Sequence, residues 1–298
     1  METKQSSIFA VVVTCNGVRW LDRCLGSLRN STFPVCTIVV DNASSDHTVF
    51  SIRKDYPEVI LIENKVNQGF GQANNTGMRI ALEQGARFIY LLNQDAWVEP
   101  DVVERLVRLM KVYPEYGILS PMQYAGDGKK LDEGFRQLLF PDLKMNNLSL
   151  KIYSVDFVMA AHWLIRTAAL KETGGFLPLF RHYGEDKNLI HRMTYYGWKT
   201  GIAVHLKGFH DRENRPESGE QKLQIQYGRY LAQSVDINRP GRLWPKYFRE
   251  FVSVIVRTDA PVNLRMNYLC KAIGRIVPII RYRYYSRGTE KANFLWIQ

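Results

Sequence analysis

The segment LLNQDAW, residues 91–97, ends an apolar run with one amide and one carboxylate, Asn93 and Asp95. A second carboxylate, Asp41, directly follows the apolar run IVV. Carboxylates in such places can bind Mg²⁺, which needs only one or two of them when substrate phosphates and water complete its coordination shell. An isolated Asp after a strand is more often a turn former or a helix cap, because its side chain accepts hydrogen bonds from nearby backbone N–H groups. Taken singly, these residues leave a metal site and a structural role both open.

A glycine-rich segment lies between these carboxylates in the chain. It reads NQGFGQANNTG, residues 67–77, and combines three glycines with several Asn and Gln side chains. Glycine permits close approach of the backbone to a ligand, and amide side chains can bind phosphate, ribose or base. Alone the signal is weak, since Gly and Asn also make ordinary loops.

An alternating array of strands and helices is needed to bring these residues together. Short apolar runs rich in β-branched residues are typical of buried parallel strands, and apolar residues three and four positions apart predict helices between them. The predicted strands are 8–13, 36–40, 58–62, 87–92 and 117–121, and the predicted helices are 18–30, 47–56 and 100–113. We expect an open α/β sheet with right-handed crossovers, in which ligands bind outside the carboxyl ends of the strands. Residues 123–137 are expected to form a surface loop.

The first loop argues against three other classes of nucleotide-binding enzyme. The first predicted strand continues into VTCNGVRW, which contains neither GxGxxG nor GxxxxGK[ST]. A dehydrogenase or a P-loop NTPase would therefore lack its phosphate-binding loop. A sugar nucleotidylyltransferase shares such a sheet, but its first loop should be rich in glycine and basic residues, whereas this loop has one Gly and one Arg.

The positive charge is concentrated at the C-terminal end. The chain of 298 residues has a formal net charge of +11, and from Arg239 onward it has twelve Lys and Arg against three acidic residues. The apolar runs of this region, such as 251–256 and 276–280, are far shorter than the ~20 residues that cross a bilayer. Basic residues interleaved with Trp, Tyr and Phe fit helices lying on an anionic membrane surface. A packed helical region with a solvated basic face, or a surface for single-stranded nucleic acid, would have the same composition.

The N-terminus and the cysteines indicate a cytoplasmic protein. METKQSSIFAVVV contains an apolar run too short for a signal peptide. The four cysteines, Cys15, Cys24, Cys36 and Cys270, form no CxxC pair and no regular framework, so reduced thiols are expected. With 46% hydrophobic and 23% charged residues, the composition is that of a globular protein with a sizeable core.

Five motifs follow one another along the chain. They are VVVTCN (11–16), VVDNASSDHT (39–48), NQGFGQANNTG (67–77), LLNQDAWVEPD (91–101) and LFRHYGEDKNLIHRMTYYGWK (179–199). In this order they resemble the motifs of family 2 glycosyltransferases of the GT-A fold, in particular the bacterial rhamnosyltransferase-like branch. The resemblance covers roughly residues 7–215.

The resemblance implies a fold and a division of the chain. Residues 1–215 are expected to form an α/β GT-A domain, Rossmann-like, with a mainly parallel central sheet and flanking helices. Its nucleotide-sugar half lies at about 1–122 and its acceptor half at about 123–215. Residues 216–298 are expected to form a basic and aromatic helical region.

Two groups of donor-binding residues are implied by the same resemblance. The nucleobase and ribose are expected to be held by Thr14, Asn16 and Asp41. The loop that closes over the nucleotide is expected to include Asn67, Gly69 and Asn75.

The motif NQD, residues 93–95, occupies the place of the family's DxD signature, and in this branch the first acid is commonly Asn. The resemblance implies that Asp95 binds the metal and that Asn93 offers an amide to the ribose or to a metal-bound water. A second metal ligand is expected at His210, where relatives carry a His after the last strand, with His205 as a less well aligned alternative. Either Mn²⁺ or Mg²⁺ is expected, and imidazole suits Mn²⁺ better.

The pair Glu185 and Asp186 carries the chemistry that the resemblance implies. Asp186 matches the general base that takes the proton of the acceptor hydroxyl, a role worth ~10²–10⁴-fold in rate. Glu185 is expected to orient the acceptor or to cap the helix that begins near Asp186. Without the resemblance, two acids here would indicate only a helix N-terminus enriched in acidic residues.

These features predict an inverting, metal-assisted glycosyltransferase that is cytoplasmic and peripheral on the inner face of the plasma membrane. The expected donor is a dTDP- or UDP-sugar, with rhamnose as one candidate sugar. The expected acceptor is a lipid-linked saccharide or a growing polysaccharide of cell-surface glycan synthesis, such as O-antigen or capsule, and no nucleic acid is expected. A non-catalytic nucleotide-binding module stays an alternative, supported by Asn93, and a nucleic-acid-binding protein acting through the basic tail is a third.

Overall fold

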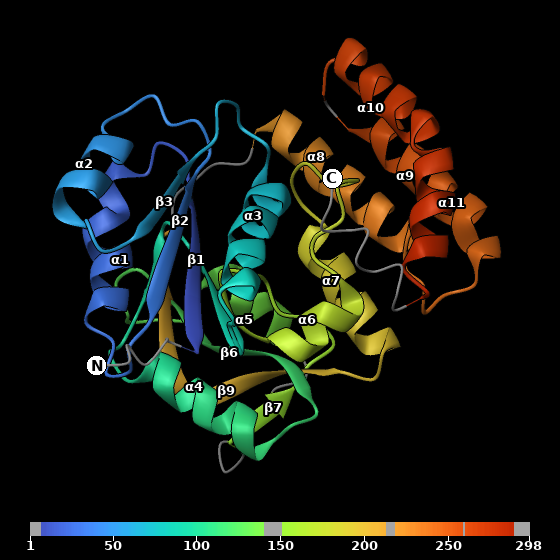
Figure 1. Ribbon diagram of the computed structural model, residues 1–298. Helices are drawn as coiled ribbons and strands as arrows, with labels where there is room; N and C mark the ends of the chain where they lie inside the picture. The colour runs from blue at the N-terminus through green and yellow to red at the C-terminus, as the bar shows by residue number, and fades with distance from the viewer. Residues whose placement is uncertain (1–6, 140–150, 213–217, 259, 289–298) are drawn as a thin grey trace.

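The computed structural model describes residues 7–139, 151–212, 218–258 and 260–288. These residues form a central sheet of nine strands, with helices packed on it and a helical C-terminal region at one side (Figure 1). The strands are β1 (Ile8–Thr14), β2 (Cys36–Asp41), β3 (Ile60–Glu63), β4 (Phe88–Asn93), β5 (Ala96–Val98), β6 (Tyr116–Ala125), β7 (Ile152–Ser154), β8 (His162–Arg166) and β9 (Lys199–His210). The α-helices are α1 (Leu21–Arg29), α2 (Thr48–Asp55), α3 (Phe70–Glu83), α4 (Val102–Val112), α5 (Glu133–Leu139), α6 (Thr167–Thr173), α7 (Glu185–Tyr195), α8 (Gly219–Ser234), α9 (Trp244–Arg257), α10 (Val262–Gly274) and α11 (Ile276–Tyr285). Two short 3₁₀ helices are η1 (Val18–Trp20) and η3 (Gly241–Leu243).

The sheet has a parallel part and a mixed part. Its strand order is β3-β2-β1-β4-β8-β6-β9-β5, and β7 pairs with β9. Strands β3, β2, β1 and β4 are parallel neighbours, whereas β8 runs antiparallel to both β4 and β6. Parallel pairing brings the carboxyl ends of β1, β2 and β4 to one edge, which is where the sequence predicted a ligand site.

The predicted strands and helices of the first 120 residues are present with small shifts at their ends. The third strand begins at Ile60, two residues later than predicted, and the fifth extends to Tyr116–Ala125. The helix predicted from residue 100 begins at Val102, so Pro100 precedes it. These elements were predictable because their hydrophobic pattern is local.

The surface loop predicted at 123–137 is wrong. Strand β6 continues to Ala125, and α5 begins at Glu133. Between them, the buried carboxylate of Asp132 accepts the backbone N–H of Phe135 (2.8 Å) at the start of α5 and pairs with Arg212 from beyond β9. This long-range ion pair orders a segment whose polar composition had indicated a loop.

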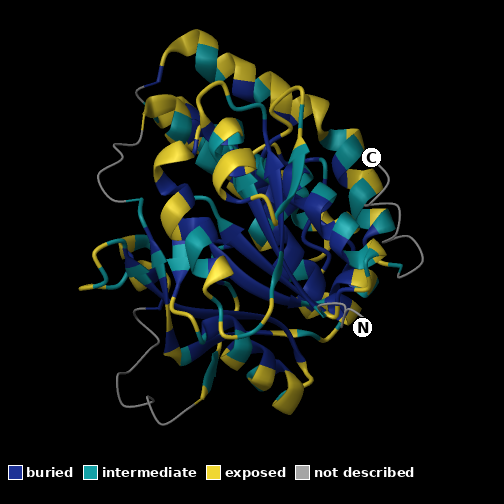
Figure 2. Cartoon of the chain, turned by 60° about the vertical axis from the view of Figure 1, so that its left-hand side comes forward, coloured by how far each residue is buried: buried dark blue, intermediate teal, exposed yellow. Residues whose placement is uncertain are grey.

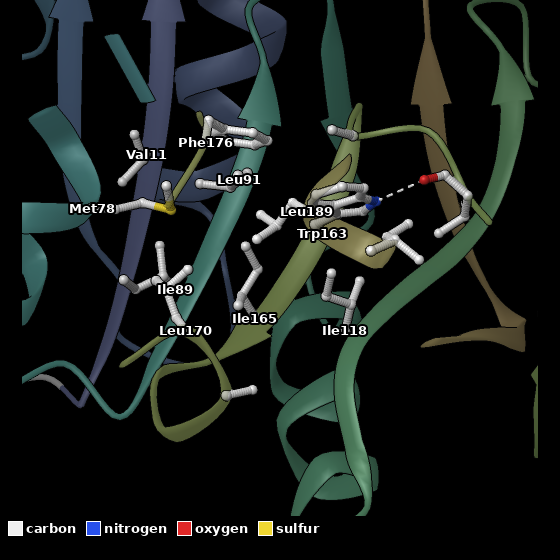
Figure 3. Close-up of a cluster of buried hydrophobic side chains, with 14 of the residues drawn as sticks. Val11, Met78, Ile89, Leu91, Ile118, Trp163, Ile165, Leu170, Phe176 and Leu189 are labelled. Atoms are coloured by element: carbon white, nitrogen blue, oxygen red, sulfur yellow. Dashed lines mark hydrogen bonds between the residues drawn. The ribbon is translucent and has the colours of Figure 1, made fainter. Parts of the chain in front are cut away.

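Apolar side chains fill both faces of the sheet (Figures 2 and 3). On one face Met78 of α3 and Leu189 of α7 pack with Trp163 and Phe176 over the strands. On the other face α1, α2 and α4 cover the strands, so that the strands are buried and the outer sides of the helices are exposed (Figure 2). Fully burying one Val, Leu or Phe contributes ~1.5–3 kcal/mol, so the sheet edge is a rigid support for a site.

The C-terminal helices form a core of their own. Helix α8 contacts α7, α9 and α10, and aromatic residues such as Tyr230, Phe251 and Tyr268 are buried between the helices. Figure 1 shows α9, α10 and α11 together on the side of α8 that faces away from the sheet. The predicted boundary at residue 215 lies outside the described residues, and the predicted division near residue 122 stays a prediction.

Candidate active site

A cavity of about 1800 Å³ lies at the carboxyl ends of β1, β2 and β4 and reaches α8 and α10. Its wall at the sheet edge includes Cys15 after β1, Asn42 after β2, and Asn93 and Asp95 at the end of β4. Single small-molecule sites are usually ~300–1,000 Å³. The cavity is therefore large enough for two substrates side by side.

Strand register explains why three of the predicted residues meet at this edge. Thr14 is the partner of Asp41 in the β1–β2 pair, and Val13 is the partner of Asn93 in the β1–β4 pair. The Thr14 hydroxyl donates to Asp41 Oδ1 (3.1 Å), and both side chains are buried. A carboxylate and a hydroxyl that hydrogen-bond each other hold these two strand ends together.

The predicted nucleobase and ribose residues form a hydrogen-bonded group around the ends of β1 and β2. Asp41 also accepts the backbone N–H of Ser44 (2.9 Å), and Asn16 Oδ1 accepts the backbone N–H of Ser45 (2.8 Å). Thr14, Asn16 and Asp41 are therefore joined to one another through the loop after β2 and are not among the residues lining the cavity. Their contact with nucleobase and ribose stays a prediction.

Two residues of the predicted glycine loop do line the cavity. Asn67 Oδ1 accepts hydrogen bonds from Asn42 Nδ2 and from the backbone N–H of Gly69, both at 2.9 Å. Gly69 has φ +83°, and a Cβ there would lie 2.3 Å from the carbonyl oxygen of Arg181. Only glycine fits this close approach. Asn42, which ties the loop to β2, was not singled out in the sequence, although it stands next to Asp41 in the second motif.

Asn75 lies on α3 and not in the loop before it, and its predicted contact with a nucleotide stays a prediction. Its Nδ2 donates to the Phe176 carbonyl and its Oδ1 accepts the Phe176 N–H, both at 2.8 Å. The amide is buried, and its nitrogen and oxygen are both hydrogen-bonded to Phe176. It therefore joins α3 to the segment before α7, and it does not line the cavity. Glycine-rich sequence gave no sign of a partner 101 positions away.

Asp95 and His210 are brought together by the pairing of β5 with β9. Ala96 is the strand partner of His210, and the backbone N–H of Asp211 donates to the Asp95 carbonyl (2.8 Å). His210 Nε2 lies 3.4 Å from Asp95 Oδ1, and both residues are buried and line the cavity. His205, the alternative, is exposed and is not on the cavity wall.

His210 has a carboxylate on each side. Its Nδ1 lies 3.9 Å from Asp132 Oδ2 and is a buried nitrogen without a hydrogen-bond partner among the described residues. Arg212 holds Asp132 from the other direction, with its Nε 2.8 Å and Nη2 2.5 Å from the two carboxylate oxygens. Burial disfavours the charged form of Asp132, but the hydrogen bonds from Arg212 outweigh it and hold the pKa of Asp132 below its ordinary value. Sequence reasoning missed this pair because the two residues lie 80 positions apart.

A second buried histidine supports the end of β9. His162 Nε2 lies 3.0 Å from the Phe209 carbonyl, and its Nδ1 lies 2.9 Å from the Tyr90 hydroxyl. Burial lowers the pKa of His162 to about 3, with His210 as a further cause. Because a carbonyl only accepts, the neutral ring donates from Nε2 and accepts from Tyr90. These two hydrogen bonds fix the residue that precedes His210.

The Asp95–His210 pair fits a divalent cation. Among the described residues, no group of three or more His, Cys, Asp and Glu side chains could hold a metal. A metal here would therefore take Asp95 and His210 from the chain and complete its shell with substrate oxygens and water, as Mg²⁺ and Mn²⁺ accept. The unpartnered His210 Nδ1 beside Asp132 has the arrangement that orients a ligating His, with the carboxylate facing the far ring nitrogen.

Glu185 and Asp186 open α7 directly after the cavity wall. Residues 181–183 line the cavity, whereas Glu185 and Asp186 do not. Asp186 Oδ1 accepts the backbone N–H of Lys187 (2.7 Å), and burial raises the pKa of Asp186 above its ordinary value. A raised pKa strengthens a carboxylate as a base. The predicted catalytic roles of the pair stay predictions.

Glu185 should make stability fall as pH rises. Burial first, and the charge of Asp186 second, raise the pKa of Glu185 from 4.5 to about 8. The folded state then favours the neutral acid, so the free energy of unfolding falls from about pH 4.5 upward and the loss is complete above about pH 8, at about 1.4 kcal/mol per pKa unit. Glu185→Gln, neutral at every pH, is expected to be more stable than the native protein by a few kcal/mol at pH 8.5 and nearly equal to it at pH 4.5. Urea unfolding at both pH values measures this difference. A Glu83→Gln variant at an exposed position is the control, and a pH-independent difference for Glu185→Gln would contradict the expectation.

Helix α8 positions the segment that leads into Glu185. A Cβ on Gly228 of α8 would lie 2.3 Å from the Tyr183 carbonyl oxygen, and one on Gly184 would lie 2.5 Å from the Gly228 carbonyl oxygen. Gly228→Ala is therefore expected to displace residues 183–186 and to lower the predicted transfer activity at least tenfold, without changing the affinity for a nucleotide at the predicted site on the sheet edge. Gly219→Ala, on the same helix with open space around it, is the control. Full transfer in a folded Gly228→Ala protein would show that α8 does not position this segment.

The sheet order, the cavity and the site residues define a GT-A glycosyltransferase fold, and comparison with solved structures agrees. The chain superposes on Staphylococcus aureus TarS in complex with UDP with a TM-score of 0.56 and 15% identity, covering 90% of this chain and 71% of that one. It superposes on the mannosyltransferase PcManGT of Pyrobaculum calidifontis, in complex with GDP-Man and Mn²⁺, with a TM-score of 0.60 and 14% identity, covering 98% and 87%. At these identities the likeness shows the fold.

The family model for glycosyl transferase family 2 matches residues 9–174, more than half of the chain, so the chain belongs to that family. It is 26% identical over 216 residues to the N-acetylglucosaminyl-diphospho-decaprenol L-rhamnosyltransferase of Mycobacterium tuberculosis, over 63% of this chain and 70% of that protein. It is 30% identical over 102 residues to the dTDP-rhamnosyl transferase RfbF of Shigella flexneri, over 34% and 33%. The chain spans 40% of the length of a further relative, EpsH of Bacillus subtilis. The resemblance to this family and to its rhamnosyltransferase-like members is thereby confirmed.

Of the helices in the described part of the chain, none is long and apolar enough to cross a membrane.

Proposed function

We propose that the protein transfers a sugar from a nucleotide-diphosphate sugar to an acceptor hydroxyl, with inversion at the anomeric carbon. The observation that carries the proposal is the buried Asp95–His210 pair, 3.4 Å apart, in a cavity that also contains the glycine loop. A family 2 chain with this cavity has room for donor and acceptor together.

Asp95 and His210 would hold the divalent cation, Mn²⁺ or Mg²⁺. When bound, the cation would supply positive charge next to the departing nucleotide diphosphate, worth several kcal/mol at the transition state. Asp132, whose Oδ2 lies 3.9 Å from His210 Nδ1, would orient His210 when the cation is bound, and Arg212 favours the ionised form of Asp132. Asn93, half-buried on the wall, offers its amide to the ribose or to a water on the cation.

Asp186 is proposed as the base. Its carboxylate takes the proton of the acceptor hydroxyl while the hydroxyl oxygen attacks the anomeric carbon, and the bond from that carbon to the diphosphate oxygen breaks. Attack from the side opposite the leaving group inverts the anomeric centre. Desolvation of Asp186 favours this proton transfer because it raises the proton affinity of the carboxylate.

The donor is proposed to be a dTDP- or UDP-sugar, with rhamnose as the leading sugar. Support comes from two relatives named as rhamnosyltransferases, one of them for dTDP-rhamnose, and from the UDP complex of a structural neighbour. The acceptor is proposed to be lipid-linked, as the name of the mycobacterial relative suggests. A cell-surface glycan such as O-antigen or capsule would be the product.

Turnover tests the function. With dTDP-rhamnose, UDP-GlcNAc and GDP-mannose offered separately with Mn²⁺ and a polyprenyl-diphosphate saccharide, one donor is expected to release its nucleotide diphosphate, and the release should depend on both acceptor and metal. Acceptor-independent or absent release with every donor would count against transfer. A non-catalytic nucleotide-binding protein is the second candidate, because Asp186 is not on the cavity wall, and such a protein would bind a donor without release.

The exposed face of the C-terminal helices is proposed to lie on an anionic membrane. Of the fourteen large apolar side chains exposed in the described residues, eight lie between Val254 and Tyr284. Six of them, spaced three, four or seven positions apart on α10 and α11, are called the apolar stripe here: Val262, Met266, Ile273, Val277, Ile280 and Tyr284. Exposed basic residues such as Arg257 and Arg281 flank the stripe. An apolar stripe with basic flanks suits the interface of an anionic bilayer.

Charge reversal tests the membrane contact. Each basic residue near an anionic surface is worth about 1 kcal/mol, so R249E/R257E/R281E is expected to weaken binding to phosphatidylglycerol vesicles at least 100-fold in a sedimentation assay. The matched control, K54E/R79E/R108E, reverses three exposed charges on α2, α3 and α4. Equal vesicle binding by the two triple variants would contradict the membrane contact and indicate that the C-terminal helices have a purely structural role.

A further inference from the structure

The arm of the cavity between α8 and α10 has a charge pattern that the donor site does not explain. The wall here includes Tyr227 of α8, Tyr268 and Lys271 of α10, and Arg275 directly after α10. Two cations, Lys271 and Arg275, thus line the cavity four positions apart in the chain. The carboxylate among the residues lining this arm is Glu220, which leaves the arm with a net positive charge.

These cations are available to a ligand. Lys271 and Arg275 are exposed, and neither forms an ion pair with the described residues. By contrast, Arg212 of the same cavity is paired with the carboxylate of Asp132. A cleft lined mainly by one sign of charge concentrates ligands of the opposite sign.

Helix α10 has two faces with different chemistry. Lys271 and Arg275 are four positions apart and Tyr268 three before Lys271, which puts all three on one side of the helix. Val262, Met266 and Ile273 point to the opposite side, about 180° away at about 100° per residue. The helix therefore separates the cationic arm of the cavity from the exposed apolar stripe.

Aromatic rings close the arm beneath the cations. The rings of Tyr227 and Tyr268 have centroids 5.5 Å apart, and Lys271 Nζ lies 4.7 Å from the Tyr268 centroid. A cation over an aromatic face is held in place while its N–H groups stay free to donate. Arg275 adds a guanidinium, which can bind phosphate oxygens with two parallel hydrogen bonds.

We propose that Lys271 and Arg275 form a subsite for an organic diphosphate, the anionic part of the acceptor. The assignment rests on the proposed glycosyltransferase function, since it names the acceptor chemistry of the same cavity. The donor diphosphate would lie at the opposite end, beside Asp95 and His210, so the two diphosphates occupy different arms. A diphosphate held here would keep the acceptor's sugar inside the cavity.

Calorimetry with the full chain tests the subsite. Farnesyl diphosphate is the probe, added with the donor site saturated by nucleotide diphosphate and Mn²⁺. K271Q/R275Q is expected to weaken farnesyl diphosphate binding at least tenfold and to leave nucleotide binding unchanged. The matched control K54Q/R108Q, which removes two exposed charges from α2 and α4 outside the cavity wall, should change either affinity less than twofold.

Three further measurements identify what the subsite binds. Inorganic pyrophosphate should compete with farnesyl diphosphate, and its failure to compete would overturn the proposal. If K271Q/R275Q weakens binding only to phosphatidylglycerol vesicles, the two cations belong to the membrane contact and the subsite is excluded. Equal farnesyl diphosphate affinity in the native and K271Q/R275Q proteins, with nucleotide-sugar binding intact, would contradict the subsite without contradicting the proposed transferase function. Absence of any nucleotide-sugar binding by the native protein would instead contradict the proposed transferase function.

Discussion

Asp186→Asn is expected to lower kcat at least 10²-fold and to leave the affinity for the nucleotide-sugar donor within about twofold of native. The amide has the shape of the carboxylate but cannot take the acceptor proton, and general-base catalysis is typically worth ~10²–10⁴-fold. Donor affinity should be kept because Asp186 lies at the start of α7, outside the wall that the sheet edge presents to the nucleotide. Steady-state kinetics and donor calorimetry on the same preparation measure the two effects separately.

Asp127→Asn is the control for this prediction, because Asp127 is an acidic residue on an exposed turn away from the cavity wall. A pH profile adds a second readout, since a base with a raised pKa should give an acid limb in kcat that the Asn variant lacks. Retained transfer in Asp186→Asn would remove Asp186 from the mechanism, and it would favour the binding-module alternative only if the native protein also failed to turn over a donor.

Asp95→Asn is expected to abolish the dependence of donor binding on Mn²⁺ and to reduce kcat/KM at least 10²-fold. The proposed site has two side chains for the cation, Asp95 and His210. Asp95→Asn removes the carboxylate and leaves His210 as the remaining ligand. The fall in Mn²⁺ affinity can be read directly from the spin resonance of free Mn²⁺ in the presence of nucleotide diphosphate, independently of activity.

Asp132→Asn should have a smaller effect on the same measurement. Carboxylates that orient a ligating His typically contribute 10–100-fold in metal affinity, and the variant also weakens the pair with Arg212. Asp101→Asn, which pairs with Arg105 on α4, is the control. Native Mn²⁺ affinity in Asp95→Asn would place the cation elsewhere or show that the protein works without one.

The LLNQDAW segment has one carboxylate, Asp95, and an amide, Asn93, where a second acid could stand. The structure provides His210, not a second Asp, as the partner of Asp95, because β5 and β9 pair with Ala96 opposite His210. The site does not need an acid at position 93 to offer a cation two side chains. A neutral side chain there would also limit the negative charge beside the proposed donor diphosphate.

The fold was predictable because its signals are local. Buried strands such as Ile8–Thr14 are short runs of β-branched residues, and the glycine loop has a composition that stands out within eleven positions. The strand-end residues Asp41, Asn93 and Asp95 were found by the rule that ligands collect at the carboxyl ends of parallel strands.

The parts that could not be predicted depend on distant pairing. Asp132 and Arg212 meet only because β6 and β9 run side by side with a register shift after Pro121, and nothing near either residue shows it. The Asn75 amide was assigned to the nucleotide, whereas its hydrogen bonds go to the Phe176 backbone. The family resemblance placed His210 and Asp186, but the cavity contains the first and not the second.

The most direct test of the central claim is a thermal-shift panel of dTDP-, UDP- and GDP-sugars, each with Mn²⁺, with Mg²⁺ and with a chelator. We predict that one donor stabilises the native protein in the presence of metal, that the stabilisation disappears with chelator, and that Asp95→Asn shows none of it. Stabilisation that is equal with metal and with chelator would contradict the metal site at Asp95 and His210, and no stabilisation by any donor would contradict the assignment of the cavity to a nucleotide sugar.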